Sequence, residues 1–417
     1  MDYSFRGPFN DVLLSRISRT IDALGMQGKV AVAMDTRPSS PALYNLITSH
    51  LLQNGNEVHS LGVAPTPVLS FYTKHANCLG IMITASHNPM DDNGIKMFFR
   101  GAEAQGITPH PSSPAPSHKL FTIDAYLLYI QNALAQVDTS TIKSRKPKVL
   151  IDCINGTAAN YTPFILRSAG AHVVTVNAEL SHPFSREPEP TENALAYLVD
   201  MVRELDADFA VAHDPDADRC RIVTRDGVMN QDVQLLNMAD ALCSEGDTFV
   251  TTVEASQLVS DILKTKGVSV EITPVGSNFI ARALQKRGRF GGEPCGEYVY
   301  PHFLLTADGV MTALQFTKLY CDRGFTNYKP YSTIRGKVEV HDKDKSMSMI
   351  RAKLAGEHGV KMLSTLDGLL FEYNNARVLI RKSNTQNIVR ITCEHKDEES
   401  ARSVYSRVMK IVEGIKV

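Results

Sequence analysis

Asp214, Asp216 and Asp218 alternate along one short segment that ends in Arg219. The segment directly follows the apolar residues 208–212, which we predict to form a strand. Three carboxylates that converge in a tight loop can hold one hard cation, and oxygen ligands favour Mg²⁺, Mn²⁺ or Ca²⁺ over zinc. An EF-hand loop is excluded because Arg219 stands where that loop requires glycine. A solvated acidic turn is the alternative, although adjacent carboxylates repel one another without a cation.

Ser86 occupies a similar place at the end of another apolar run, residues 79–84. His87 follows it directly, and Lys96 lies a little further along the chain. A serine hydroxyl in such a turn can act as a nucleophile or as a phosphate carrier. On residue types alone, an ordinary Ser-Asn-Pro turn explains the segment equally well.

Two more segments carry polar side chains suited to a ligand. Glu293 and Glu297 flank Cys295 in a glycine-containing stretch, and their carboxylates can accept hydrogen bonds from sugar hydroxyls. Residues 381–387 and Arg390 combine cationic with small polar side chains, which can bind a phosphate. Alone, the first segment is also compatible with a turn, and the second with a basic hairpin on a solvated face.

The elements that must position these residues repeat three times along the chain. Short apolar runs alternate with helical patterns, which indicates parallel α/β units. The expected strands are 29–35, 57–61 and 79–84, then 148–152, 172–176 and 208–212, then 248–252 and 268–272. The expected helices are 39–54, 67–75, 158–169, 192–205, 256–266 and 279–287. Functional loops of such sheets lie at the carboxyl ends of the strands.

The remainder of the chain has a different pattern. Strands are expected at 334–340, 369–373, 377–381 and 388–393, followed by a helix over 398–412, which predicts a small α+β domain. Linkers are expected at 139–147, 244–247 and 323–330, and the proline-rich residues 106–118 are expected to form a surface loop. The predicted domains are 1–143, 144–245, 246–325 and 326–417.

Composition narrows the class of protein. Of 417 residues, 44 are Lys or Arg and 45 are Asp or Glu, so the net charge is −1. This balance argues against nucleic-acid or membrane-surface partners. No apolar run is long enough to span a bilayer, and no secretory signal is visible. The seven cysteines are scattered singly, which disfavours structural zinc and disulfides and is typical of a cytoplasmic protein.

In this order, the four segments resemble those of the α-D-phosphohexomutase family, which includes phosphoglucomutase, phosphomannomutase and phosphoglucosamine mutase. Residues 84–89 are similar to that family's phosphoserine loop, and residues 214–219 are similar to its metal loop. Residues 3–7 and 35–39 resemble two further motifs. The resemblance implies three related α/β domains with mixed sheets, plus a smaller C-terminal α+β domain, around a central cleft.

The resemblance also implies roles for individual residues. Ser86 would carry a phosphoryl group, and one Mg²⁺ per chain would bind to Asp214, Asp216, Asp218 and a phosphoserine oxygen. The resemblance implies that His87, Lys96 and Arg6 take part in proton transfer and charge stabilisation, and that Arg219 orients the phosphoryl group. It also implies that the sugar is bound by Glu293, Cys295 and Glu297. The residues implied to bind the non-reacting phosphate are Arg381, Ser383, Asn384, Thr385 and Arg390.

The implied reaction interconverts hexose 1-phosphates and 6-phosphates through a hexose bisphosphate, which is also the activator. The partner would be a phosphosugar, and the chain would be a monomer or homodimer. Residues 323–330 would act as a hinge while the intermediate turns around.

The sugar loop departs from the family pattern. Cys295 replaces a serine and Glu297 replaces a histidine that serves as an acid or base in some members. Either Glu297 takes that part with a raised pKa, or another residue does. A glucose or mannose phosphate is the favoured substrate, and glucosamine phosphate or a pentose phosphate is the alternative. A sugar-phosphate phosphatase and a non-catalytic sugar-phosphate-binding protein are the alternatives from other classes.

Overall fold

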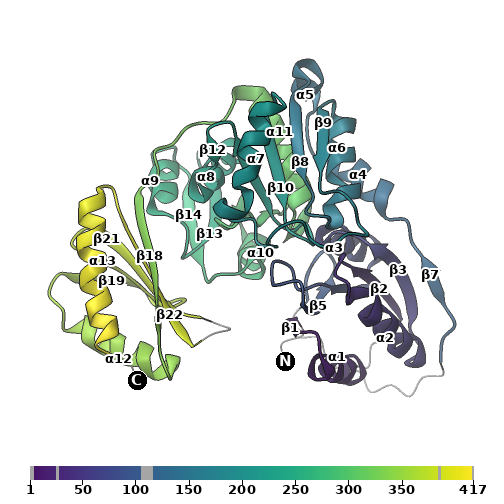
Figure 1. Cartoon of the computed structure of the whole chain (residues 1–417), viewed down its shortest axis with the longest axis horizontal. Helices are drawn as coiled ribbons and strands as arrows, with labels where there is room; N and C mark the ends of the chain where they lie inside the picture. Colours follow the sequence, from purple (N-terminus) through teal and green to yellow (C-terminus); the bar gives the residue numbers. More distant parts are fainter. Residues whose placement is uncertain (1–3, 25–27, 105–115, 384–386, 416–417) are drawn as a thin grey trace.

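The structure, a computed structural model, describes residues 4–24, 28–104, 116–383 and 387–415. Its first three units repeat one strand order, in which the first strand lies between the second and third and the fourth strand is antiparallel to the third (Figure 1). The first unit contains β2 (Lys29–Met34), β3 (Glu57–Val63), β4 (Leu79–Ile83) and β5 (Asp92–Phe99). The second contains β8 (Lys148–Asp152), β9 (His172–Val176), β10 (Phe209–His213) and β11 (Cys220–Thr224). The third contains β13 (Thr248–Thr252), β14 (Ser269–Thr273), β15 (Phe290–Gly292) and β16 (Tyr298–Tyr300). The predicted repeat and its mixed sheets are confirmed.

The loop between the third and fourth strands carries a candidate segment in every unit. Ser86 lies between β4 and β5, the three aspartates lie between β10 and β11, and Glu293 lies between β15 and β16. The three loops are therefore topologically equivalent.

The helices that were expected from periodicity cover these sheets. They are α2 (Ser40–Gln53), α3 (Thr66–Ala76), α6 (Thr162–Ala169), α7 (Glu192–Glu204), α9 (Gln257–Thr265) and α10 (Ser277–Lys286). Helix α6 starts later than expected because a 3₁₀ turn, η1 (Thr157–Asn160), precedes it. Helices not expected from the sequence are α1 (Asp11–Leu24), α4 (Tyr126–Leu134), α5 (Ser140–Arg145), α8 (Gln231–Leu242), α11 (Gly309–Arg323) and α12 (Lys343–Ala355). Helix α5 lies within the segment that was expected to be a linker, and its Ile142 is fully buried.

Short strands connect the first and third units. β17 (Leu304–Ala307) pairs with β6 (Ala102–Glu103), so that the two units share one twelve-stranded sheet in the described part of the chain. β1 (Phe5–Pro8) adds to β5 with Arg6 opposite Gly94. A Cβ at Gly94 would lie 2.2 Å from the Phe5 carbonyl oxygen, so this pairing requires glycine. β7 (Leu120–Thr122) pairs with β3, and β12 (Gly227–Val228) pairs with β11. Most of the expected proline-rich loop lies outside the described residues.

The last unit is the predicted small α+β domain. Its antiparallel sheet contains β18 (Ser332–Glu339), β19 (Val360–Ser364), β20 (Leu369–Tyr373), β21 (Ala376–Lys382) and β22 (Ile388–His395), in the order β18-β22-β21-β20-β19. Helices α12 (Lys343–Ala355) and α13 (Glu398–Glu413) pack on it.

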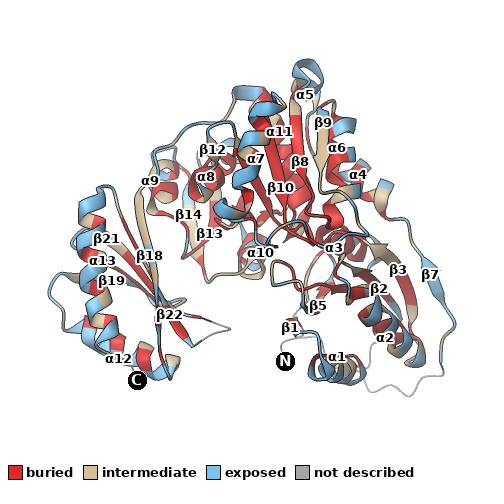
Figure 2. Ribbon diagram, viewed as in Figure 1, coloured by how far each residue is buried: buried red, intermediate tan, exposed pale blue. Residues whose placement is uncertain are grey.

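The central strands β2, β8, β10 and β13 are buried along almost their whole length, and helices such as α2 bury one face against their sheet (Figure 2). A large aromatic cluster joins the first three units: Phe71 stacks on Phe303, and Tyr129 contacts both rings. The last domain has its own core around Phe371 and Val378. In the described part of the chain, no helix combines the length and apolar character needed to cross a bilayer.

The last domain contacts the third unit through polar groups and through a small apolar cluster of Val253, Leu370 and Leu379. Arg377 Nη2 donates to the Val253 carbonyl oxygen at 2.6 Å, and Val275 N donates to Asp367 Oδ2 at 2.9 Å. Glu394 accepts from the Gln257 backbone N–H at 3.1 Å, at the first turn of α9. The described contacts between these two units are therefore partly polar and partly apolar.

Asp308 predicts a pH-dependent contribution to stability. It caps α11 by accepting from Met311 N at 2.9 Å, and both its oxygens lie 2.8 Å from the Tyr129 hydroxyl. Burial raises its pKa to about 6, so the carboxyl stabilises the folded chain at low pH and loses that contribution as pH rises through about 6. In Asp308→Asn the side chain does not titrate. The stability of the wild type relative to this variant should therefore fall by about 2–3 kcal/mol between about pH 4 and 7.

Urea midpoints of both proteins at the two pH values measure this difference. Asp206→Asn is the control, because the Asp206 side chain is 90% exposed. A stability difference for Asp308→Asn that stays constant with pH would contradict the assignment.

Candidate active site

Ser86 is held in a left-handed backbone conformation with φ of 51°. Its amide N donates to Thr84 Oγ1 at 2.7 Å, and its carbonyl oxygen accepts from Arg37 Nη2 at 2.6 Å. Such a conformation is costly for a residue with a side chain, so the surrounding contacts must impose it. The result is a fixed direction for the Ser86 hydroxyl.

Arg37 holds the backbone of this turn in place through several hydrogen bonds. It is 1% exposed and pairs with Asp35 at 3.0 Å. Its remaining donors bind carbonyl oxygens of the turn, including that of Asn88 at 2.8 Å and that of Asp92 at 3.0 Å. The planar guanidinium thus fixes several backbone groups at once, which a lysine could not do.

The Ser86 hydroxyl points toward the second unit. Its Oγ lies 3.2 Å from Asp214 Oδ2 and 3.3 Å from His87 Nδ1. The predicted serine and the predicted metal loop, far apart in the sequence, therefore meet at hydrogen-bond distance.

The three aspartates form a buried cluster with one oxygen from each within 4.8 Å of the others. Lys96 Nζ lies 2.9 Å from Asp216 Oδ2 and 2.6 Å from Asp218 Oδ2. The other carboxylate oxygens, Asp216 Oδ1 and Asp218 Oδ1, are buried without a hydrogen-bond partner. Buried oxygens without partners are costly, and a divalent cation would satisfy them. The residues present thus fit one hard cation.

The pKa values of the three aspartates differ from one another because their carboxyl groups lie close together. Burial and the other two carboxylates raise the pKa of Asp214 well above its usual range. Burial and Asp216 raise the pKa of Asp218 to about 6. Burial would also raise the pKa of Asp216, but Lys96 and a hydrogen bond from Thr66 outweigh it and the pKa is lowered. Burial opposes the charge on Lys96, yet Asp216 and Asp218 raise its pKa. A single ammonium group therefore cannot balance all three carboxylates.

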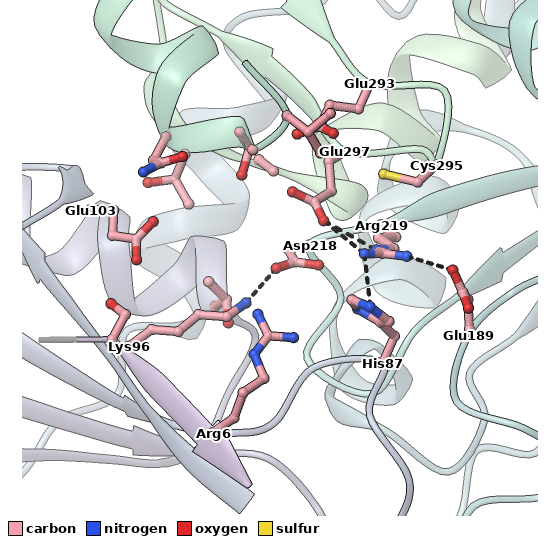
Figure 3. Close-up of a pocket in the computed structure, with 18 of the residues that line it drawn as sticks. Arg6, His87, Lys96, Glu103, Glu189, Asp218, Arg219, Glu293, Cys295 and Glu297 are labelled. Carbon is pink, nitrogen blue, oxygen red and sulfur yellow. Dashed lines mark hydrogen bonds and ion pairs between the residues drawn. The ribbon is translucent and has the colours of Figure 1, made fainter. Parts of the chain in front are cut away.

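Arg219 connects the metal loop to the sugar loop (Figure 3). Its Nε lies 3.1 Å from Glu297 Oε1, and its Nη2 lies 3.5 Å from His87 Nε2. Its backbone N donates to Asp214 Oδ1 at 3.1 Å. Burial and then the Arg219 charge lower the pKa of His87 to about 2, so this imidazole is neutral.

Of the two alternatives for the acid or base, the pKa of Glu297 favours the one in which another residue takes that part. Burial alone would raise this pKa, but the paired Arg219 and nearby Lys96 lower it. Glu293 behaves in the opposite way, because burial and then the neighbouring Glu297 raise its pKa well above the usual range. Of these two carboxyls, Glu293 is the one that can hold a proton near neutral pH.

All four candidate segments line one cavity of about 610 Å³. The predicted residues that line it are Arg6, His87, Lys96, Asp218, Arg219, Glu293, Cys295, Glu297, Arg381, Ser383 and Arg390. Ser86, Asp214 and Asp216 are buried next to it, within contact of lining residues. Asn384 and Thr385 lie outside the described residues.

The wall opposite Ser86 carries two arginines in register. Arg381 on β21 lies directly across from Arg390 on β22. Arg381 Nη2 is 2.9 Å from Asp367 Oδ2, its Nη1 contacts Glu254, and its Nε is buried without a partner. Paired cations on adjacent strands repel one another, so this wall is suited to an anion.

The cavity also has lining residues that the sequence analysis did not identify. Glu103, Glu189, Glu254 and residues 276–278 belong to it, and so does Thr66, whose hydroxyl donates to Asp216 Oδ2 at 2.7 Å. Of these, only residues 276–278 have a recognisable local pattern in the sequence. They read Gly-Ser-Asn at the start of α10, and Gly276 has a φ of 132°.

Known proteins share both the domains and their order. The models of phosphoglucomutase/phosphomannomutase α/β/α domains I, II and III match residues 7–108, 124–227 and 230–338, and that of the C-terminal domain matches 336–411. A phosphoglucomutase/phosphomannomutase of Thermococcus kodakarensis is 35% identical, over 92% of this chain and 90% of the relative. A probable phosphoglucosamine mutase of Methanothermobacter thermautotrophicus is 33% identical, over 94% and 91%.

A solved structure has the same fold. The phosphoglucomutase/phosphomannomutase family protein from Burkholderia thailandensis superposes with a TM-score of 0.85 at 22% identity, covering 99% of this chain and 96% of the other.

The aspartate cluster predicts that Mg²⁺ stabilises the folded protein. At a hundredfold excess over its dissociation constant, a bound cation adds about 2.7 kcal/mol to the free energy of unfolding. Asp214→Asn should lose this gain because one ligand charge is gone. Without divalent cations it should be at least as stable as the wild type, since one buried like charge is removed.

Thermal midpoints with MgCl₂ and with EDTA measure both effects. Asp226→Asn, an exposed acidic residue in a neighbouring turn, is the matched control. Equal stabilisation of Asp214→Asn and wild type by Mg²⁺ would show that the cation binds elsewhere.

Proposed function

Because the chain belongs to the α-D-phosphohexomutase family and is a phosphomutase, we propose that it interconverts hexose 1-phosphates and hexose 6-phosphates through a phosphorylated Ser86. One observation carries this proposal. The Ser86 hydroxyl lies 3.2 Å from the aspartate cluster, and the opposite wall of the same cavity carries the Arg381–Arg390 pair. A carrier group and a separate phosphate-binding wall are what a transfer between two positions of one sugar requires.

The residues around Ser86 are proposed to manage charge during the transfer. Asp214, Asp216 and Asp218 would hold Mg²⁺, which when bound neutralises negative charge that develops on the phosphoryl oxygens. Lys96 remains an ammonium group, and with Arg6 and Arg219 it presents cationic donors to the phosphoryl oxygens.

Proton transfer at the sugar is assigned to Glu293. Its raised pKa allows it to deliver a proton to a leaving oxygen and recover one from an attacking hydroxyl. Glu297 stays ionised and holds Arg219 in place. Cys295 lines the cavity beside them.

The reaction needs the hexose bisphosphate to reverse its orientation. One phosphate lies at Ser86 while the other contacts Arg381, Ser383 and Arg390, and the two then exchange. Asn384 and Thr385 are proposed to belong to the same phosphate wall. Glucose and mannose phosphates are the proposed substrates. Glucosamine phosphate is the second candidate because several curated relatives at 31–34% identity are named phosphoglucosamine mutases or probable ones.

The carrier role predicts a covalent phosphate on Ser86. After incubation with Mg²⁺ and glucose 1,6-bisphosphate, the intact mass of the wild type should rise by one phosphoryl group. Ser86→Ala should not gain it and should lose at least about 10⁴-fold in turnover, as expected when a nucleophile is removed. Ser348→Ala, an exposed serine on α12, is the control and should behave as wild type.

The same preparation distinguishes the classes of protein. It is offered the 1-phosphates of glucose, mannose, glucosamine and ribose in turn. Isomerisation supports the mutase and ranks the sugars, whereas release of free phosphate would indicate a phosphatase. A protein that binds these sugars but changes none of them would contradict catalysis.

A hinge before the last domain predicts a change of shape with ligand. Residues 324–331 form no helix or strand, and several of the contacts between the last domain and the third unit are polar. Adding Mg²⁺ and glucose 1,6-bisphosphate should reduce the radius of gyration in small-angle scattering. Arg390→Gln should weaken the effect because the phosphate wall is impaired. Identical wild-type profiles with and without ligand would contradict the hinge.

A further inference from the structure

A second cavity of about 190 Å³ lies beside Arg219. It shares Glu189, Arg219 and Cys295 with the larger cavity, but otherwise has its own walls. Arg221 and the start of α8 contribute from the second and third units, and Arg335 on β18 contributes from the last domain. Nothing in the proposed reaction uses this space.

Arg221 is the unexplained charge in this cavity. It is 6% exposed, and it donates to Gln234 Oε1 at 3.1 Å and to the Met229 carbonyl oxygen at 2.7 Å. Both partners are neutral, and Arg221 makes no ion pair with any described residue. A buried guanidinium without a direct ion pair is costly, and burial lowers its pKa, although the nearby Asp232 carboxylate acts in the opposite direction. An anion in the adjoining cavity would supply the missing charge.

The other groups around the cavity add to the positive potential. Arg335 is exposed and likewise makes no ion pair within the described ranges. The first turn of α8 lines the cavity at Asn230 and Gln231, where the helix dipole favours an anion. Two exposed carboxylates also line it, Glu189 and Glu192, and Glu189 lies 3.5 Å from Arg219 Nη1, so its charge is paired with that arginine.

We propose that this cavity binds a tetrahedral oxyanion of the phosphate type between Arg221 and Arg335. The volume is below the roughly 300–1,000 Å³ typical of pockets for larger organic ligands, so a small anion or a single phosphoryl group fits better than a whole cofactor. Free phosphate and the phosphoryl group of a sugar phosphate share this chemistry. The bound anion would connect the last domain, through Arg335, to the second unit, through Arg221.

Crystals of the full chain soaked in tungstate, a heavy tetrahedral oxyanion, test the location. We expect one anomalous peak at the Arg381–Arg390 wall and a second between Arg221 and Arg335. Arg335→Gln should remove only the second peak and Arg390→Gln only the first. Because Arg335 is exposed, its substitution leaves the core intact, and Arg221→Gln then tests the buried partner. Absence of the second peak in wild-type crystals would overturn the proposal.

Solution binding separates a real site from one filled only at crystal concentration. Thermal midpoints are measured against inorganic phosphate at constant ionic strength in Arg390→Gln, where the larger site is impaired. We expect saturable stabilisation, with affinity about tenfold weaker when Arg335→Gln is added. Equal affinity in both variants, or no saturation, would overturn the proposal.

Glucose 6-phosphate in place of phosphate distinguishes the two sources of the anion. Stabilisation of Arg390→Gln by both compounds, weakened by Arg335→Gln, identifies a phosphoryl group as sufficient. Stabilisation by phosphate alone identifies the free anion. No step depends on turnover, so the outcome is independent of the proposed reaction.

Discussion

The crowding of three buried carboxylates around one ammonium group is the constraint on which the rest of the structure depends. Asp216 and Asp218 share Lys96, whereas Asp214 lies 3.2 Å from the Ser86 hydroxyl and accepts from the Arg219 backbone N–H at 3.1 Å. This cluster would be unfavourable if the loop could move away. The Thr66 backbone N–H donates to the Asp216 carbonyl oxygen at 2.9 Å, and Gly309 N donates to the Ala217 carbonyl oxygen at 3.1 Å. The first and third units thus hold the loop of the second in place. Because the carboxylates cannot move apart, binding of a cation would relieve their mutual repulsion.

Repetition of one strand order explains how such different groups meet. In each of the first three units the reacting segment follows the third strand, so that every loop occupies the equivalent edge of its sheet. The sheet pairing of Leu305 with Ala102 and the aromatic cluster around Tyr129 fix the units relative to one another. The three topologically equivalent loops therefore meet at a single cavity, to which they bring a serine, a carboxylate cluster and a pair of glutamates.

The features that could be predicted from the sequence are formed by residues close together in the chain. The features that were missed depend on contacts between distant segments. Ser86 and the three aspartates stood out because their chemistry is contained in a few adjacent residues. The sequence could not decide between the two alternatives for Glu297, because its partner Arg219 is 78 residues away. Helix α11 was missed because most of its residues are buried and it shows no polar face with helical periodicity. Arg37 gave no chemical signal, although it shapes the Ser86 turn. The domain boundaries and the roles of Asn384 and Thr385 remain predictions.

The arginines of the larger cavity share a feature that bears on reorientation of the intermediate. Arg219 is paired with Glu297, and Arg381 is paired with Asp367 and Glu254. A phosphate that reaches either guanidinium exchanges one anion for another, so the arginine need not be left buried without a counter-charge at any stage. Exchange of this kind costs less than exposing an unpaired ion. A phosphate could therefore bind at either wall without binding so tightly that it cannot leave. Arg221 has no such ion pair among the described residues, and this difference separates the smaller cavity from the two walls between which we propose that the sugar turns.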